Sequence, residues 1–389
     1  MKLLQVIKKR ISDCFVVWGK ELVQVRKDVG VVIFFVLVPL AYPILYGTIY
    51  TTETIHNVPM VVVDESHSSL AREFVRKIDA TADVQVYVYA ASMEEARKIV
   101  SEKKAYGILR IPSDFSLRIH RGEQATIGLY IDMSGLLFYK AMLLATTEAS
   151  LDDFAKQIRY EASGMHAQSS VKYEAVTLFN PQSGFASFLL PAILILVIQQ
   201  TLLLGIGMLC ATVRERNNGR LIPHESYYGG VTRIVFGKAL AYLTVYIFIC
   251  IWALIIVPKI FNLPQIGHYY VGLLFILPYL LACIFFAMMI ATFFRGRETP
   301  MMILVFTSLI FLFLSGVSWP LQAIPAFWRY FSYLIPSTFG IQGFVKLNTM
   351  GAALNEVAWE YKALWLQTAV YFTATCVIYG YNLKKENKQ

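Results

Sequence analysis

Charged residues are scarce in this chain of 389 residues. Only 16% of its residues are Asp, Glu, Lys or Arg, against roughly 25% in an ordinary soluble domain, and 57% are hydrophobic. This composition excludes an ordinary soluble protein and indicates an integral membrane protein. The formal net charge of +9 does not indicate nucleic-acid binding, because Lys and Arg stand mostly beside apolar runs, where the positive-inside rule accounts for them.

Cysteine is scarce as well, and its positions exclude a disulfide framework. The five cysteines all lie in or next to apolar segments, and residues 51–180 have none, so this polar stretch gains no disulfide. No CxxC pair occurs, and His224-Glu225 is not followed by a second His at metalloprotease spacing. We therefore expect no metal site.

Motifs of nucleotide hydrolysis and of covalent catalysis are missing. Gly19-Lys20 and Gly237-Lys238 lack both the upstream Gly and the following Ser or Thr of a Walker A loop, and no GxSxG occurs. Few charges lie within the apolar runs, so a proton or sodium relay is not indicated. We expect a non-catalytic chain without a cofactor of its own, in which any ATP would be bound by a partner subunit.

Long apolar runs are what the chain has instead, and residues 185–257 organise them. Two runs, 187–213 and 234–257, flank a polar Arg-rich stretch at 214–233, and the second is interrupted only by Lys238. A run of about 20 apolar residues is long enough to cross a bilayer as a helix. The pair therefore predicts a membrane hairpin whose basic loop faces the cytoplasm.

The whole chain follows the same pattern, which predicts an α-helical polytopic membrane protein with six transmembrane helices. The predicted spans are residues 29–50, 187–213, 234–257, 269–294, 301–318 and 365–381. Residues 183–389 would form a five-helix transmembrane domain. Every short basic loop and both termini then fall in the cytoplasm, so the topology is self-consistent.

Residues 1–28 are predicted to form an amphipathic cytoplasmic helix. Ile11, Phe15, Trp18 and Leu22 recur at three- and four-residue steps, with polar residues on the other side. Such a helix suits the membrane surface, and it equally suits packing on the cytoplasmic side of the protein itself. The sequence leaves both positions open.

Residues 51–182 are predicted to form an external α/β domain inserted between the first and second spans. Strands are expected at 58–64, 84–89, 106–111 and 126–132, and helices at 68–80, 92–104 and 136–163. Asp64, Asp114 and Asp132 lie near strand ends. They are candidates for a carboxylate site, but turn and helix-cap chemistry is the simpler interpretation.

Two further features are candidate parts of a transport path. Gln199 and Gln200 form a polar pair within the second span and could line a substrate path, although hydrogen bonding between helices is the simpler explanation. Residues 319–344 are divided by prolines into pieces too short to cross. They either re-enter the membrane or form an aromatic-rich interfacial loop.

Several loose motifs appear in a fixed order along the chain. The external stretch carries Val61 to Asp64, then Gly107 to Phe115 with Pro112-Ser-Asp-Phe, then Ile131-Asp132. Arg214-Glu-Arg-Asn-Asn-Gly219 follows the second span and precedes Gly237-Lys238. Leu314-Ser-Gly316, Trp319-Pro320, Ile324-Pro325 and Leu334-Ile-Pro336 come last. In this order the chain resembles permease subunits of the type 2 ABC exporter family, in its drug-efflux-like bacterial branch.

The resemblance implies a bacterial inner-membrane permease that works as a homodimer or heterodimer with a related permease and is driven by a separate ABC ATPase subunit. It implies ATPase contact at residues 1–28 and at the loop, with Arg214, Glu215, Arg216 and Gly219 as candidates. It also implies an outer gate in residues 319–344, with Trp319, Pro320, Pro325 and Pro336 as candidates. The family's hydrophobic and Thr-Pro sequence after the Gly is replaced here by residues 220–229.

We therefore expect export of an amphipathic or lipid-like substrate, with a periplasmic adaptor protein as a further possible partner of the external domain. The alternative is a membrane-anchored sensor or scaffold whose external domain binds a ligand or a partner. A membrane enzyme is disfavoured, because no cluster of convergent polar residues occurs within the spans.

Overall fold

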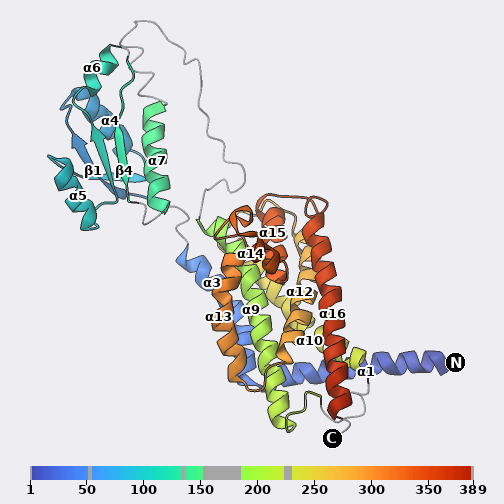
Figure 1. The fold of residues 1–389 in the computed structure, drawn as a ribbon. Helices are drawn as coiled ribbons and strands as arrows, with labels where there is room; N and C mark the ends of the chain where they lie inside the picture. The colour runs from blue at the N-terminus through green and yellow to red at the C-terminus, as the bar shows by residue number, and fades with distance from the viewer. Residues whose placement is uncertain are drawn as a thin grey trace. The chain divides into compact units, whose positions relative to one another are not determined.

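The computed structural model describes residues 2–50, 55–121, 123–132, 136–151, 185–222 and 230–386. The chain divides into two compact units, residues 54–176 and a helical unit made of residues 1–53 and 177–389 (Figure 1). Each unit is described by itself.

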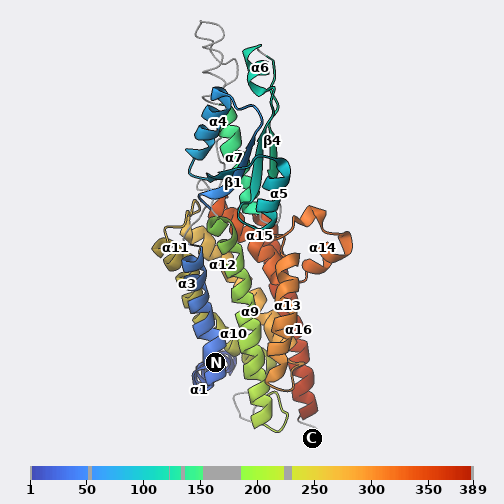
Figure 2. The same cartoon turned by 90° about the vertical axis from the view of Figure 1, so that its left-hand side faces the viewer.

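The helical unit contains long helices and two short π-helical segments. Its elements are α1 (Lys2–Lys27), α2 (Val29–Val32), π-helical η1 (Ile33–Leu37), α3 (Val38–Ile49), α9 (Phe185–Arg216), α10 (Val231–Ile251), π-helical η3 (Trp252–Ile256), α11 (Val257–Ile260), α12 (Tyr269–Ala291), α13 (Glu298–Leu314), the 3₁₀ turn η4 (Leu321–Ala323), α14 (Ala326–Ser332), α15 (Pro336–Thr349) and α16 (Ala358–Glu386). Helices α9, α10, α12, α13 and α16 run alongside one another, whereas α1 lies across one end of them (Figures 1 and 2).

Five helical stretches in the described residues are long and apolar enough to cross a membrane. They are Val29–Ile49, Phe185–Arg216, Val231–Ile260, Tyr269–Ala291 and Ala358–Lys385. The predicted span at 301–318 corresponds to α13, which is apolar but only 17 residues long. It ends at Leu314 because Gly316 takes a left-handed conformation with φ +86°. At 1.5 Å per residue α13 is about 26 Å long, short of the ~30 Å hydrocarbon core.

Two prolines account for the π-helical segments. Pro39 has no N–H, so the carbonyl of Phe35 loses its partner four residues on, and η1 lies immediately before this position. Pro258 leaves the carbonyl of Leu254 free in the same way, and Gln265 Nε2 donates to that carbonyl at 2.9 Å. The first span is thus a continuous helix that widens locally before Pro39.

Helices α9 and α12 form the centre of the bundle. The most apolar windows of these helices are 78% and 67% buried, respectively. Tyr279 on α12 donates its hydroxyl proton to the carbonyl of Ile195 on α9 at 2.5 Å. The ring of Tyr279 also lies 2.5 Å from where a Cβ of Gly340 would be, so glycine is what allows α15 to pack this closely.

The unit of residues 54–176 contains a four-stranded sheet of order β2-β1-β3-β4. Its elements are β1 (Val58–Asp64), α4 (Ser69–Asp79), β2 (Val84–Tyr89), α5 (Met93–Ser101), β3 (Gly107–Ile111), α6 (Phe115–His120), β4 (Gly128–Ile131) and α7 (Leu136–Leu151). β1 is parallel to β2 and β3, and β4 is antiparallel to β3. Helices α4 and α7 cover one face and α5 the other (Figure 1). The strands lie where the sequence predicts them; the rest of the helix expected to residue 163 is outside the described residues.

The three aspartates near strand ends make local interactions. Asp64 Oδ1 accepts hydrogen bonds from the backbone N–H groups of residues 66 and 67, as in an Asx turn. Asp114 pairs with Arg118 at 2.5 Å on α6, and Asp132 pairs with Lys103 at 2.6 Å. These contacts fit turn and helix-end chemistry and do not form a shared carboxylate site.

Helix α1 packs along α10 through an unexpected row of side chains. From residue 9 onward, the buried side chains are Val17, Glu21 and Val25 of α1 and Asp28 directly after it, at steps of three and four. The predicted apolar row is partly exposed: Ile11 is 53% and Phe15 55% accessible. The sequence left the position of the apolar row open, and the structure turns a mixed row towards α10, because Glu21 of α1 finds its partner Lys238 there. The exposed apolar row remains available to a membrane surface.

A buried ion pair fixes this contact. Lys238 Nζ of α10 lies 3.2 Å from Glu21 of α1, and the two side chains are only 7% and 1% accessible. The Tyr242 hydroxyl donates a further hydrogen bond to Glu21. At the edge of the contact, Arg233 pairs with Asp13 at 2.5 Å. Gly237 allows the close approach, since a Cβ there would lie 2.8 Å from the carbonyl oxygen of Cys14.

Replacing Gly237 by alanine tests this packing. The new methyl group would press on the backbone of α1, which cannot move aside cheaply, so we expect a loss of about 1–3 kcal/mol in stability. Gly19→Ala is the matched control on α1, because no atom lies within 4 Å of its added Cβ. Its effect should be neutral or slightly stabilising, by up to about 1 kcal/mol. Thermal unfolding in detergent compares them, and equal melting temperatures would contradict the packing.

The ion pair is tested by a double-mutant cycle. Lys238→Met leaves Glu21 buried without a counter-charge and should cost about 3–5 kcal/mol. Glu21→Gln combined with Lys238→Met removes both charges and keeps an acceptor for Tyr242, so it should recover most of that loss. Unfolding by denaturant in detergent measures the cycle. Purely additive losses would show that the two charges do not depend on each other.

Candidate functional site

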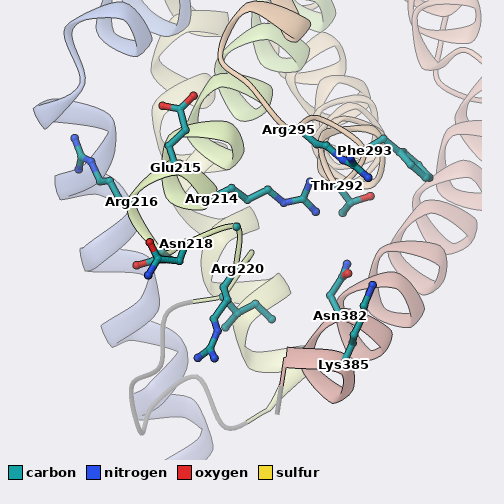
Figure 3. Close-up of a pocket in the computed structure, with 13 residues that line it drawn as sticks. Arg214, Glu215, Arg216, Asn218, Arg220, Thr292, Phe293, Arg295, Asn382 and Lys385 are labelled. Atoms are coloured by element: carbon teal, nitrogen blue, oxygen red, sulfur yellow. The ribbon is translucent and has the colours of Figure 1, made fainter. Parts of the chain in front are cut away.

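A basic cavity opens where α9, the α12–α13 turn and α16 end together (Figure 3). Its volume is about 1100 Å³. The lining is polar and carries five cations and one carboxylate. The lining residues are Arg214, Glu215, Arg216, Asn217, Asn218, Gly219, Arg220, Ile222, Thr292, Phe293, Arg295, Asn382 and Lys385. The cavity includes all four residues predicted to contact an ATPase.

The end of α9 positions the first of these residues. The sequence places Arg214 at the start of the loop, but the structure continues α9 through Arg216. Cationic side chains in the last turn favour this extension, because they face the negative end of the helix dipole. The chain then reverses at Asn218 and Gly219, with φ values of +50° and +86°. Gly219 donates its N–H to the carbonyl of Arg214 at 2.8 Å.

Arg214 and Glu215 attach the end of α9 to the α12–α13 turn. Arg214 Nη1 donates to the carbonyl of Phe294 at 2.7 Å. Glu215 accepts a hydrogen bond from the backbone N–H of Arg297 at 3.4 Å. Arg216 is exposed, and in Figure 3 it points away from Arg295. Of the four predicted contact residues, Arg214 and Glu215 thus hold the helix end, Gly219 forms the turn, and Arg216 is exposed.

Asp28 joins the same turn to α1. Its carboxylate pairs with Arg297 at 2.5 Å, accepts from the Thr212 hydroxyl at 3.0 Å and caps α2 at the Val31 N–H. Burial by itself would raise the pKa of Asp28. The hydrogen bonds and the charge of Arg297 outweigh burial and hold this pKa below its ordinary value. Asp28 therefore stays ionised and links α1, α9 and the turn.

None of the five cavity cations has a counter-charge among the described residues, and Arg214 donates only to a backbone carbonyl. Arg216, Arg220, Arg295 and Lys385 make no ion pair with a carboxylate among the described residues. Arg214 Nε is buried and has no hydrogen-bond partner there. In the described ranges, no group of three His, Cys, Asp or Glu side chains could hold a metal ion. The site is therefore suited to anions and has no acid–base pair.

The glutamine pair lies elsewhere, in the middle of α9. Gln199 Oε1 accepts a hydrogen bond from the backbone N–H of Ser337 at 2.7 Å, so it caps the first turn of α15. Gln199 thus makes the interhelical hydrogen bond that was the simpler explanation. Gln200 is 7% accessible, and its side-chain amide has no hydrogen-bond partner in the part of the chain described.

The predicted gate residues separate in the structure. Trp319, Pro320 and Pro325 are exposed, and both prolines stand immediately before short helices, η4 and α14. Pro336 is buried at the first position of α15, beside the Gln199 cap. The structure thus brings Gln199 and Pro336 together, although the sequence offered them as separate features.

Several residues of this end were missed by the sequence analysis. Glu21, Asp28, Asn382 and Lys385 had no assigned role. Lys238, the one charge in its apolar span, was the available signal for Glu21, because a charge within a span requires a buried partner. Nothing in the local sequence indicates that Lys385 shares a cavity with Arg295, since the two are 90 positions apart.

Comparison with known proteins assigns the family. Residues 29–377 match the family described as ABC-2 family transporter protein. The chain is also similar to ABC transporter G family member 20 of Dictyostelium discoideum, with 23% identity over 359 residues. This similarity covers 89% of the chain and 47% of that protein, so the chain spans about half the length of this relative.

The family match extends from the first apolar span into α16 and covers most of the chain. It therefore includes the α15 cap, most of the bundle and the cavity residues on α9 and on the α12–α13 turn, whereas Asn382 and Lys385 lie beyond the matched range. Together with the apolar helices, it establishes that this chain is a membrane protein of the ABC-2 transporter family.

Proposed function

We propose that this chain is the non-catalytic permease subunit of an ATP-driven exporter, with ATP bound by a partner subunit. The family supports this coarse role. The observation that carries the proposal is the way α1 is attached at the basic end of the bundle. Glu21 joins it to α10, and Asp28 joins it to α9 and to Arg297. A push on α1 would therefore move several spans together.

The topology follows from the charges. We assign the basic end and both termini to the cytoplasm, by the positive-inside rule. Helix α13 then serves as the fifth of six spans, shortened at Gly316, and residues 54–176 form an inserted external α/β domain. The host membrane is the bacterial inner membrane, as the sequence resemblance implies.

The contact with the ATPase is assigned to α1 and to the turn after α9. Arg216 is the main candidate, because its side chain is exposed and pairs with no carboxylate among the described residues. Arg214 and Glu215 hold the end of α9 against the α12–α13 turn, and Gly219 takes the left-handed conformation that reverses the chain. A rim charge of this kind steers association and fixes the register of a partner.

The remaining parts of the proposal concern the assembly and the substrate. Helix α13 exposes an apolar face in which Val305, Phe306 and Leu309 are 69%, 75% and 58% accessible. Lipid or a second permease, identical or related, would cover it. The proposed substrate is amphipathic or lipid-like. Residues 319–344 would form the outer gate, and Gln200 would face the substrate path. A periplasmic adaptor protein would bind the external domain.

The proposal is tested by purifying the tagged full chain from native membranes in mild detergent. We expect a protein with a Walker A motif to co-purify and to hydrolyse ATP. Arg216→Glu should weaken that association about fivefold, because it reverses one rim charge worth about 1 kcal/mol. Arg97→Glu, an exposed charge reversal on α5, should leave it unchanged.

Mass spectrometry and ATPase turnover read the result. Absence of any Walker-motif protein from the wild-type preparation would overturn the permease proposal and favour a sensor or scaffold. If Arg216→Glu and Arg97→Glu lost ATPase co-purification equally, the assigned contact at Arg216 would be overturned, but the partnership with an ATPase would not.

A further inference from the structure

The inner part of the basic cavity has the composition of an anion site. Figure 3 shows Arg214, Arg295, Asn382 and Lys385 facing one space, while Glu215 and Arg216 are turned away from it. The inner group thus contains three cations and one amide, and the cavity's carboxylate points elsewhere. No acidic side chain of the described residues neutralises Arg295 or Lys385.

Like charges gathered in this way repel one another unless an anion joins them. Arg214 uses Nη1 for the Phe294 carbonyl, and its Nε is without a partner. The side chains of Arg295 and Lys385 make no hydrogen bond to another described residue, so their N–H groups are available to an anion. Guanidinium groups match the geometry of phosphate oxygens, and an ammonium adds a point charge.

The position of the cavity indicates where a bound anion would come from. It lies between the ends of membrane-spanning helices, α9, α12 and α16. Phe293, which lines the cavity, and Tyr381, which precedes the lining residue Asn382, are 72% and 69% accessible. Exposed aromatic side chains at the ends of spans mark the membrane–water interface. Basic pockets between spans at this level bind acidic lipid headgroups.

We propose that this inner group, Arg214, Arg295, Asn382 and Lys385, binds the phosphate of an acidic phospholipid headgroup from the adjacent leaflet. The cavity volume of about 1100 Å³ accommodates a headgroup with water around it. Pockets for small molecules usually measure roughly 300–1,000 Å³. The bound lipid would bridge α9, the α12–α13 turn and α16. This binding requires no ATPase.

The test uses the purified full chain in detergent and native mass spectrometry with added phosphatidylglycerol or phosphatidylcholine. Phosphatidylglycerol should bind more tightly. Arg295→Gln and Lys385→Gln should each weaken it about fivefold, and together about 25-fold. Lys384→Gln is the matched control, since Lys384 is exposed beside the site but does not line the cavity. It should bind phosphatidylglycerol as the wild type does.

Three outcomes would overturn the proposal. The first is that phosphatidylglycerol and phosphatidylcholine bind equally well. The second is that Lys384→Gln loses as much phosphatidylglycerol binding as the cavity variants do. The third is that glycerol phosphate competes for the site as effectively as the whole lipid. The last would identify a site for soluble phosphate compounds. Because the measurement uses the permease alone, its result is separate from the ATPase co-purification.

Discussion

The buried pair of Lys238 and Glu21 is the constraint on which this end of the molecule depends. A charge removed from water is stable only beside its partner, so α1 has one register on α10. Gly237 allows the two backbones to approach, and Tyr242 satisfies the carboxylate further. Asp28, directly after α1, continues this row and reaches α9 and Arg297. One helix thus sets the positions of two spans and one turn.

The elements of the fold follow closely from sequence pattern. Long apolar runs predict the five long helices, and alternating runs predict the four strands. What pattern does not determine is how each element ends and which face it buries. Helix α9 continues through Arg216 because its charges suit a helix end, and α13 stops at Gly316. Helix α1 buries Glu21 because α10 carries the matching Lys238, which periodicity within α1 does not contain.

The site could be predicted only in part, for a related reason. The Arg-rich stretch at 214–220 was visible as a cluster in sequence, and it lines the cavity. Arg295 and Lys385 complete that cavity from distant segments, so their proximity depends on helix packing. Gln199 and Pro336 lie far apart in sequence, and only the packing of α15 on α9 makes them neighbours. Local pattern identifies residue types; tertiary contact decides what each one meets.

The Gln199 cap has a mechanical consequence. The N–H of Ser337 lies in an apolar interior, where a donor without an acceptor is costly. If α15 slid along α9, this donor would lose its acceptor with no water at hand to replace it. The hydrogen bond between Gln199 and the N–H of Ser337 therefore opposes sliding of α15 along α9. In any rearrangement of the bundle, α15 and the middle of α9 should move as one rigid body. Movement would then be confined to the connections on either side, including the exposed and short α14.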